Sequence, residues 1–139
     1  MPPKDLPKSE VSRNVAINVS RFRALRRLTG AELADRLAAQ GRPLSRATVS
    51  EIENMRRRVD VDDLVALSIA LDVPVVSLLM PPTYEPAAAV QMVGDRLYDA
   101  ATVWAALRGE GTWDGDWVDP DIEEIETMKR MTWPDWCPR

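Results

Sequence analysis

The chain has 139 residues, a formal net charge of −4 and a single cysteine, Cys137. This length supports one modest core, or one compact domain with an appendage. One cysteine excludes an internal disulfide and a cysteine-based zinc site. The charged, proline-rich start MPPKDLPKSE lacks the apolar segment of a signal peptide, and no run reaches the ~20 apolar residues of a membrane span. We therefore expect a cytoplasmic protein with no membrane-spanning segment.

The charge is distributed unevenly along the chain. Residues 12–58 contain 11 Lys and Arg against four acidic residues, a balance of +7, whereas residues 110–139 contain nine acidic against three basic residues, a balance of −6. A basic segment attracts phosphate. An acidic tail is repelled by phosphate, so it points away from nucleic acid, contacts another protein or covers the basic face.

Residues 1–12 are predicted to form a flexible arm, because they contain three prolines and no apolar periodicity. Two basic residues of this arm, Lys4 and Lys8, are candidates for phosphate contact. A first helix is predicted over residues 14–28. Apolar residues repeat there at helical spacing, namely Val15, Val19, Phe22, Leu25 and Leu28.

Two short capped helices are predicted within residues 29–53, TGAELADRLAAQGRPLSRATVSEIE. Thr29 and Glu32 have the spacing of a capping box, in which each side chain satisfies the other residue's free amide. Ser45 is a second helix-start signal. We expect the two helices to begin directly after these caps.

The second of these helices, over residues 46–54, has a buried and an outward side. Val49 and Ile52 define the buried side, because successive residues are about 100° apart around a helix. Ala47, Ser50 and Glu51 therefore point outward, and Arg46 flanks them at the positive N-terminal end of the helix. Small and polar groups in this position suit contact with the edges of DNA bases.

Two further helices complete the predicted N-terminal domain. Asp60 caps a fourth, strongly apolar helix, and Pro74 is suited to the first position of a fifth. Pro81 and Pro82 end the fifth helix. The prediction is an all-α domain of five helices over residues 13–80.

Four segments of this domain resemble the XRE, or Cro/C1-type, helix-turn-helix family: Phe22-Arg23, TGAELA, SRATVSEIEN and DDLVALSIALDV. The resemblance covers residues 15–79 and implies a lambda-repressor-like fold that binds double-stranded DNA. It implies base contacts from four residues, Arg46, Ala47, Ser50 and Glu51. It further implies backbone contacts from Thr29, Thr48 and Asn54, and a structural ion pair between Arg23 and Glu53.

Two features depart from the family pattern. The connection AAQGRPL between the second and third helices is several residues longer than the tight turn of compact members. Met55 stands where the family commonly has glycine, so Asn54 becomes the candidate for the left-handed residue that ends the helix. The run Arg56, Arg57 and Arg58 follows, and we interpret it as a phosphate clamp, with a solvated loop as the alternative.

The outward residues offer specific base chemistry. Arg46 suits paired hydrogen bonds to guanine, Glu51 suits the cytosine amino group and Ala47 suits the thymine methyl group. Glu51 has two other interpretations, which are rejection of wrong sequences and orientation of Arg46. The alternative for the whole face is an ordinary solvated helix surface.

The remaining chain is predicted as a linker over residues 81–89 and an acidic C-terminal region over residues 90–139. A strand over residues 90–93 turns at Gly94-Asp95, and a helix over residues 99–107 ends at Gly109. A further helix opens at Pro120. This region either packs on the N-terminal helices or serves self-association or partner binding.

Tryptophan is concentrated in this acidic region. Because each indole has a large apolar area to bury, we predict oligomer or partner contacts for Trp104, Trp113, Trp117, Trp133 and Trp136. An alternative is that the acidic tail mimics DNA and covers the arginine-rich face.

Catalysis is not predicted, because the chain contains no histidine, no glycine-rich phosphate loop and no nucleophile paired with a base. No cofactor or metal is expected. The sequence predicts a sequence-specific regulator that binds double-stranded DNA, a repressor that occludes a promoter, with phage immunity as one setting. It would be nucleoid-associated, or act in the host cytoplasm if phage-encoded. The alternative is a protein-interaction module, such as an antitoxin or a phage-encoded host-modulating factor; whether the chain forms a homodimer stays open.

Overall fold

The structure of the protein is a computed structural model, and it describes residues 9–138. The chain divides into two compact units, Met1–Pro82 and Thr83–Arg139. Most of the predicted arm, including Lys4 and Lys8, lies outside the described residues. The phosphate contacts of these two lysines therefore stay predictions.

The first helix, α1 (Glu10–Leu25), begins earlier than predicted. Ser9 is its N-cap and accepts a hydrogen bond from the Ser12 amide at 3.0 Å. The predicted start at residue 14, and with it an arm that extends to residue 12, was therefore wrong. Apolar periodicity was the signal used in the prediction, whereas a serine cap followed by an acidic residue sets the actual start.

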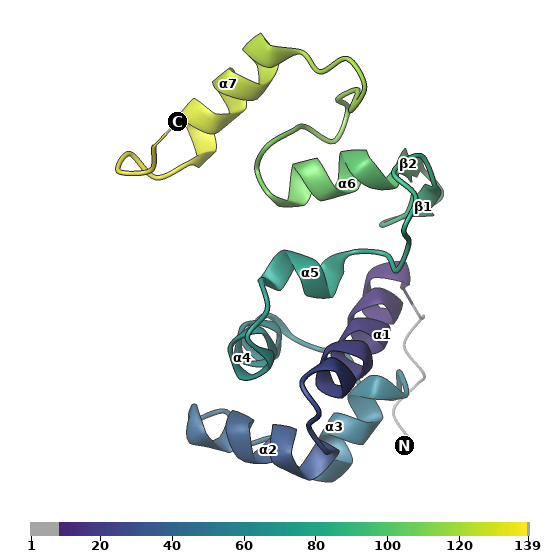
Figure 1. Cartoon of the computed structure of the whole chain (residues 1–139), viewed down its shortest axis with the longest axis vertical. Coiled ribbons are helices and arrows are strands. Elements are labelled where there is room, and N and C mark those ends of the chain that lie inside the picture. The colour runs from purple at the N-terminus through teal and green to yellow at the C-terminus, as the bar shows by residue number, and fades with distance from the viewer. Residues whose placement is uncertain (1–8, 139) are drawn as a thin grey trace, which may run out of the picture. The chain divides into compact units, whose positions relative to one another are not determined.

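Four further helices follow in the first unit: α2 (Gly30–Ala39), α3 (Arg46–Glu53), α4 (Val61–Leu71) and α5 (Val75–Leu79). The predicted caps are present. Thr29 and Glu32 form the capping box of α2, Ser45 caps α3, and Asp60 forms a capping box with Asp63 at the start of α4. The predicted five-helix domain is thus confirmed, and α2 and α3 lie next to each other in Figure 1.

The core of this unit is aliphatic and draws on all five helices. Its members share near-complete burial and include Val19, Leu33, Leu37, Val49, Ile52, Leu67, Leu71 and Leu78. Val49 and Ile52 anchor α3 in this core. At roughly 1.5–3 kcal/mol for each fully buried aliphatic side chain, this anchoring gives α3 a fixed orientation.

A buried asparagine joins α1 to the end of α5. Asn18 has an exposed fraction of 0 %, and its Nδ2 donates to the carbonyl oxygens of Leu78 at 3.0 Å and Met80 at 2.8 Å. These carbonyls lie at the C-terminal end of α5, where helical partners are missing. Asn18 was not predicted from the sequence, because its partners are about 60 residues away and a polar residue within an apolar helical pattern does not indicate them.

The second unit contains a short hairpin and two helices. Strands β1 (Ala89–Gln91) and β2 (Leu97–Asp99) are antiparallel, with Val90 opposite Tyr98. Helix α6 (Ala100–Leu107) follows β2 directly, and α7 (Ile122–Thr132) has Asp121 as its N-cap. The predicted strand over residues 90–93 is thus displaced by one residue at its start and ends earlier. Among residues 9–138, no helix has the length and apolar character needed to cross a membrane.

Gly109 allows α7 to pack near the end of α6. The indole Nε1 of Trp133 donates to the Gly109 carbonyl oxygen at 3.1 Å. A Cβ atom at this glycine would lie 2.9 Å from the same Nε1, and the backbone φ of +71° also favours glycine. Trp133 is therefore a packing residue within the second unit.

Candidate nucleic-acid interface

The outward face of α3 contains the four predicted base-contact residues. Arg46, Ala47, Ser50 and Glu51 are all exposed, whereas Val49 and Ile52 on the opposite face are buried. Burial of one face in the core leaves the other face free for a ligand. The structure therefore brings these four side chains together on one side of a single helix.

The Arg46 side chain also lies close to the start of α2. A Cβ atom built on Gly30 would lie 3.8 Å from Arg46 Cγ, so the arginine stem is in ordinary van der Waals range of this turn. In the part of the chain that the structure describes, no ion pair joins Arg46 to Glu51. The described residues therefore provide no contact that supports Glu51 as the residue that orients Arg46.

The predicted backbone-contact residues all make local hydrogen bonds. Thr29 Oγ1 accepts from the Glu32 amide at 3.1 Å, and Thr48 Oγ1 lies 3.0 Å from Ser45 Oγ. Asn54 Nδ2 donates to the Ser50 carbonyl oxygen at 2.8 Å. These bonds hold the three side chains in place at the ends of α2 and α3.

The left-handed residue after α3 is Met55 and not Asn54. Asn54 has φ −95° and ψ 9°, whereas Met55 has φ +59°. The Met55 amide donates to the Ile52 carbonyl oxygen, and the Arg56 amide donates to that of Glu51. This pattern is a Schellman motif, in which the left-handed residue follows the C-cap. The expectation that Asn54 adopts this conformation was therefore wrong.

The long connection between α2 and α3 is fixed at two points. Leu44 is buried in the core. Arg42 Nε donates to Asp63 Oδ1 at 2.8 Å, and its Nη2 donates to Asp60 Oδ2 at 2.9 Å. Because both carboxylates belong to the capping box of α4, the connection is tied to the start of that helix.

The three consecutive arginines after α3 differ in their surroundings. Arg57 Nη2 lies 3.5 Å from Asp63 Oδ2, whose side chain is almost fully buried. Arg56 and Arg58 are exposed. Arg57 thus has a structural partner, and the role of the three arginines as a phosphate clamp stays a prediction.

Arg23 and Glu53 form the ion pair that the family resemblance implies. Their shortest distance is 2.6 Å, between Arg23 Nε and Glu53 Oε1. The hydrogen bond to the Glu53 carboxylate raises the pKa of Arg23 above its ordinary value. The pair connects α1 to the last residue of α3.

The predicted contact tryptophans have different surroundings within the second unit. Trp113 packs edge-on against Tyr98 with ring centroids 5.4 Å apart, and Trp117 Nε1 donates to Asp99 Oδ2 at 3.1 Å. Arg108 lies over the ring of Trp104, with its Cζ 5.2 Å from the centroid. Trp136 is 84 % exposed, so it offers the largest free indole area of the five. Contact of any of them with a partner stays a prediction.

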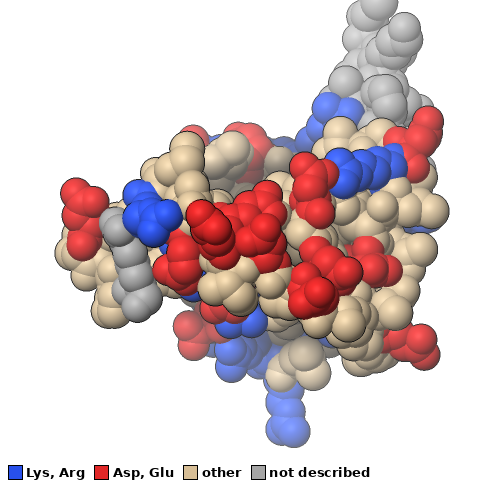
Figure 2. Space-filling view, turned by 90° about the horizontal axis from the view of Figure 1, so that it is seen from above, with Lys and Arg blue, Asp and Glu red and all other residues tan. Residues whose placement is uncertain are grey.

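The two units carry opposite charge. Residues 1–82 contain 13 Lys and Arg against ten acidic residues, whereas residues 83–139 contain five against 12. Figure 2 shows a face of the molecule on which carboxylates gather. Within the described range, no group of three or more metal-ligating side chains is positioned to hold a metal ion.

Comparison with known proteins identifies the first unit. Residues 19–78 match a protein-family model described as "Helix-turn-helix". A crystal structure of a hypothetical transcription factor, NHTF, from Neisseria is similar to this chain at 28 % identity; the similarity covers 58 % of this chain and 87 % of that chain, with a TM-score of 0.48. No curated protein matches the chain.

This match and the five-helix fold define the protein's class: it is a helix-turn-helix, DNA-binding transcription regulator. The matched residues 19–78 are similar to the Cro/C1-type, or XRE, helix-turn-helix family. The matched segment contains α2, α3 and α4 and ends within α5. It contains the predicted DNA-contact residues of α2, α3 and the arginine run, but not Lys4 and Lys8, and none of the second unit.

Proposed function

We propose that this regulator is a sequence-specific repressor that binds double-stranded DNA with α3 in the major groove and occludes a promoter. The observation that supports this proposal is the set of four exposed side chains on the outward face of α3. An α-helix fits the major groove, where each base pair presents a distinct pattern of donors and acceptors. A phage immunity repressor is one setting for this activity.

Each residue has a proposed role. Arg46 donates two hydrogen bonds to a guanine, Glu51 accepts from a cytosine amino group, and Ala47 contacts a thymine methyl group. Thr29, Thr48 and Asn54 contact the phosphate backbone near the ends of α2 and α3. A homodimer would read half-sites about one helical turn, ~34 Å, apart or a multiple of that distance.

The test is selection of bound fragments from the source genome by the full chain, with Arg46→Ala and Ser50→Ala in parallel. Enrichment of one motif by the unaltered chain, and its loss in both variants, is the expected result. Arg46→Ala should cost about 1–3 kcal/mol at the true site and relax specificity at one position. Arg13→Ala is the matched control, because Arg13 is exposed on α1 outside the proposed interface.

The competing function is a protein-interaction module that uses the exposed Trp136 and the acidic second unit. Retention of DNA without a motif, lost steeply as salt is raised, would reject sequence-specific repression. Capture of a protein partner that Trp136→Ala abolishes would then support the competing function.

A further inference from the structure

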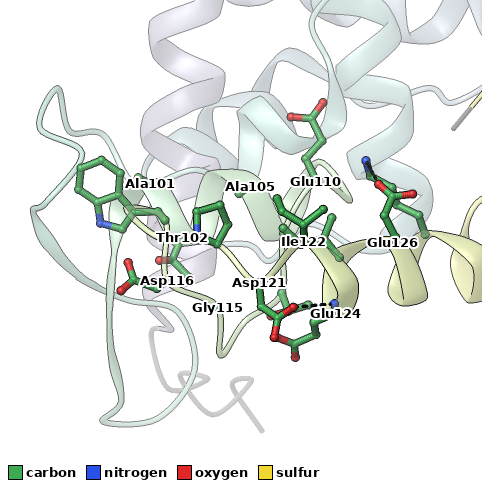
Figure 3. A pocket seen from close by; sticks show the side chains of 16 residues that line it. Ala101, Thr102, Ala105, Glu110, Gly115, Asp116, Asp121, Ile122, Glu124 and Glu126 are labelled. Atoms are coloured by element: carbon green, nitrogen blue, oxygen red, sulfur yellow. Dashed lines mark hydrogen bonds and ion pairs between the residues drawn. The ribbon is translucent and has the colours of Figure 1, made fainter.

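A pocket with a volume of about 420 Å³ lies in the second unit, between α6, residues 110–121 and α7 (Figure 3). Small-molecule sites usually measure roughly 300–1,000 Å³. The proposed DNA-contact residues do not line this pocket. Any ligand here is therefore a second ligand of the protein, distinct from DNA.

The lining of the pocket is strongly anionic. It contains one cationic side chain, Lys129, and five carboxylates: Glu110, Asp116, Asp121, Glu124 and Glu126. Asp121 caps α7 by accepting from the Glu124 amide at 3.0 Å, the interaction dashed in Figure 3. Within residues 9–138, the Glu124 carboxylate forms no ion pair. Glu124 is thus available to a cation.

Two hydroxyl groups in the lining lack partners, which is an observation independent of the charge. Thr102 on α6 is only 7 % exposed, and its hydroxyl has no hydrogen bond in the described part of the chain; its Oγ1 is not fully buried and is open to water or a ligand in the pocket. Thr112 Oγ1 is buried and also has no partner among the described residues. Buried polar groups are nearly always hydrogen-bonded, so the Thr112 hydroxyl is an unsatisfied group in the pocket wall. The Thr102 hydroxyl is the one that a ligand in the pocket can reach.

The rest of the wall is apolar and aromatic. The lining includes Ile122 and Ile125 of α7, Ala101 and Ala105 of α6, and the indole of Trp117. An aromatic face and aliphatic walls suit an organic cation, whose methylene groups need apolar contact. A small hydrated metal ion has no apolar groups that could pack against these walls.

Lys129 is an example of an alkylammonium group held beside the pocket, by the lining residue Glu126 and by Trp133, which lies outside the lining. Its Nζ lies 3.2 Å from Glu126 Oε1 and 5.1 Å from the centroid of the Trp133 ring. One carboxylate and one indole thus already hold an ammonium on a methylene chain. Of the other four carboxylates, Glu110 pairs with Arg108 at 2.8 Å. Asp116, Asp121 and Glu124 form no ion pair within residues 9–138, so three negative charges of the lining lack a cationic partner.

We propose that this pocket binds a linear aliphatic polyamine. One ammonium group donates to the Glu124 carboxylate and to the Thr102 hydroxyl oxygen, and a second ammonium is attracted by Asp116. The methylene groups between them lie against Ile122 and Trp117. This site gives the regulator a ligand that binds apart from its DNA-contact helix.

The test is titration of the full chain with spermidine, followed by calorimetry. The expected result is saturable binding of one spermidine per chain. Glu124→Gln should weaken binding by about tenfold, since a charge-assisted hydrogen bond is lost. Thr102→Val should weaken it several-fold, and Thr102→Ser, which retains the hydroxyl, should restore it. Thermal unfolding of each variant checks that the second unit is folded.

Glu123→Gln is the matched control, because it makes the same charge change on α7 at a residue that does not line the pocket. Equal weakening by Glu123→Gln and Glu124→Gln, or displacement of spermidine by Mg²⁺ at equal ionic strength, would show general charge attraction and overturn the proposal. The cationic side chains of a partner protein are a second source of ammonium-type groups, and a blocked Arg-Lys-Arg peptide tests for them. Saturation by the peptide but not by spermidine would mean a partner's side chains fill the pocket, and would also overturn it.

Discussion

Arg23 on α1 and Glu53, the last residue of α3, are joined by two parallel hydrogen bonds. Arg23 Nε donates to Glu53 Oε1 at 2.6 Å, and Nη2 donates to Oε2 at 3.1 Å. The remaining nitrogen, Nη1, donates to the Leu28 carbonyl oxygen at 3.0 Å. The side chains are 24 % and 15 % exposed, so water screens the pair only partly. This pair fixes the C-terminal end of α3 to α1.

Replacement of Arg23 by lysine should destabilise the domain although the charge is kept. A lysine ammonium lacks the planar fork that bonds both carboxylate oxygens at once. We expect Arg23→Lys to lower the free energy of unfolding by about 1–3 kcal/mol, measured by urea denaturation. Arg13→Lys on the exposed side of α1 should change it little. Equal effects of the two substitutions would contradict a specific role for the Arg23–Glu53 pair.

Glycine at position 55 should stabilise the domain relative to alanine. Met55 has φ +59°, a conformation that costs a residue with a Cβ roughly 1–2 kcal/mol, and the greater freedom of glycine in the unfolded chain offsets about 0.4–1 kcal/mol of this. Both Met55→Gly and Met55→Ala remove the methionine side chain beyond Cβ. The difference in stability between the two variants therefore isolates the backbone effect. A higher midpoint of thermal unfolding for the glycine variant is expected, and a lower one would show that the left-handed conformation is not strained here.

The helices of the first unit were predictable because local signals and apolar periodicity agree. Thr29, Ser45 and Asp60 each act as the N-cap that the sequence indicates. The start of α1 was missed because the Ser9 cap lies before the apolar pattern. The left-handed residue after α3 was misplaced by one position, because a preference of Asn for this conformation is weaker than the geometry of the Schellman motif.

The family resemblance implied one long-range polar contact, the Arg23–Glu53 pair. The other long-range polar contacts could not be predicted from the sequence. The outward positions of Ala47, Ser50 and Glu51 on α3 followed from the helical repeat, with Arg46 flanking them. The bond of Asn18 to the end of α5 and that of Arg42 to Asp63 depend on the packing of helices that are distant in sequence. The second unit has short strands and few helix caps, so the sequence contained no local signal that predicts the pocket between α6 and α7.

Arg56 and Arg57 should differ in their effects on DNA binding and stability. Arg56 is exposed, whereas Arg57 is paired with the buried carboxylate of Asp63. If Arg56 contacts a phosphate, Arg56→Ala should lower the slope of log K against log salt by about 1 and leave the unfolding free energy unchanged. Arg57→Ala should instead lower the unfolding free energy, because it leaves Asp63 with fewer partners. An unchanged salt slope in Arg56→Ala would reject its contact with phosphate.

The cap of α4 should make the first unit sensitive to acid. Asp60 Oδ1 accepts from the Asp63 amide at 2.7 Å, and this bond, together with the charges of Arg42 and Arg57, lowers the pKa of Asp60 below its ordinary value of 3.8. A lowered folded-state pKa contributes stability above the unfolded-state value, and that stability is lost as the pH falls through the folded-state value. Asp60→Asn keeps a capping oxygen but does not titrate. Urea unfolding between pH 7 and pH 2 should therefore show wild type more stable than Asp60→Asn at neutral pH, with the difference shrinking below about pH 3.8. Asp62→Asn makes the same charge change in the same turn without removing this capping carboxylate. A difference that stays constant across the pH range for Asp60→Asn, or that shrinks as much for Asp62→Asn, would show that the Asp60 cap is not the source of the acid sensitivity.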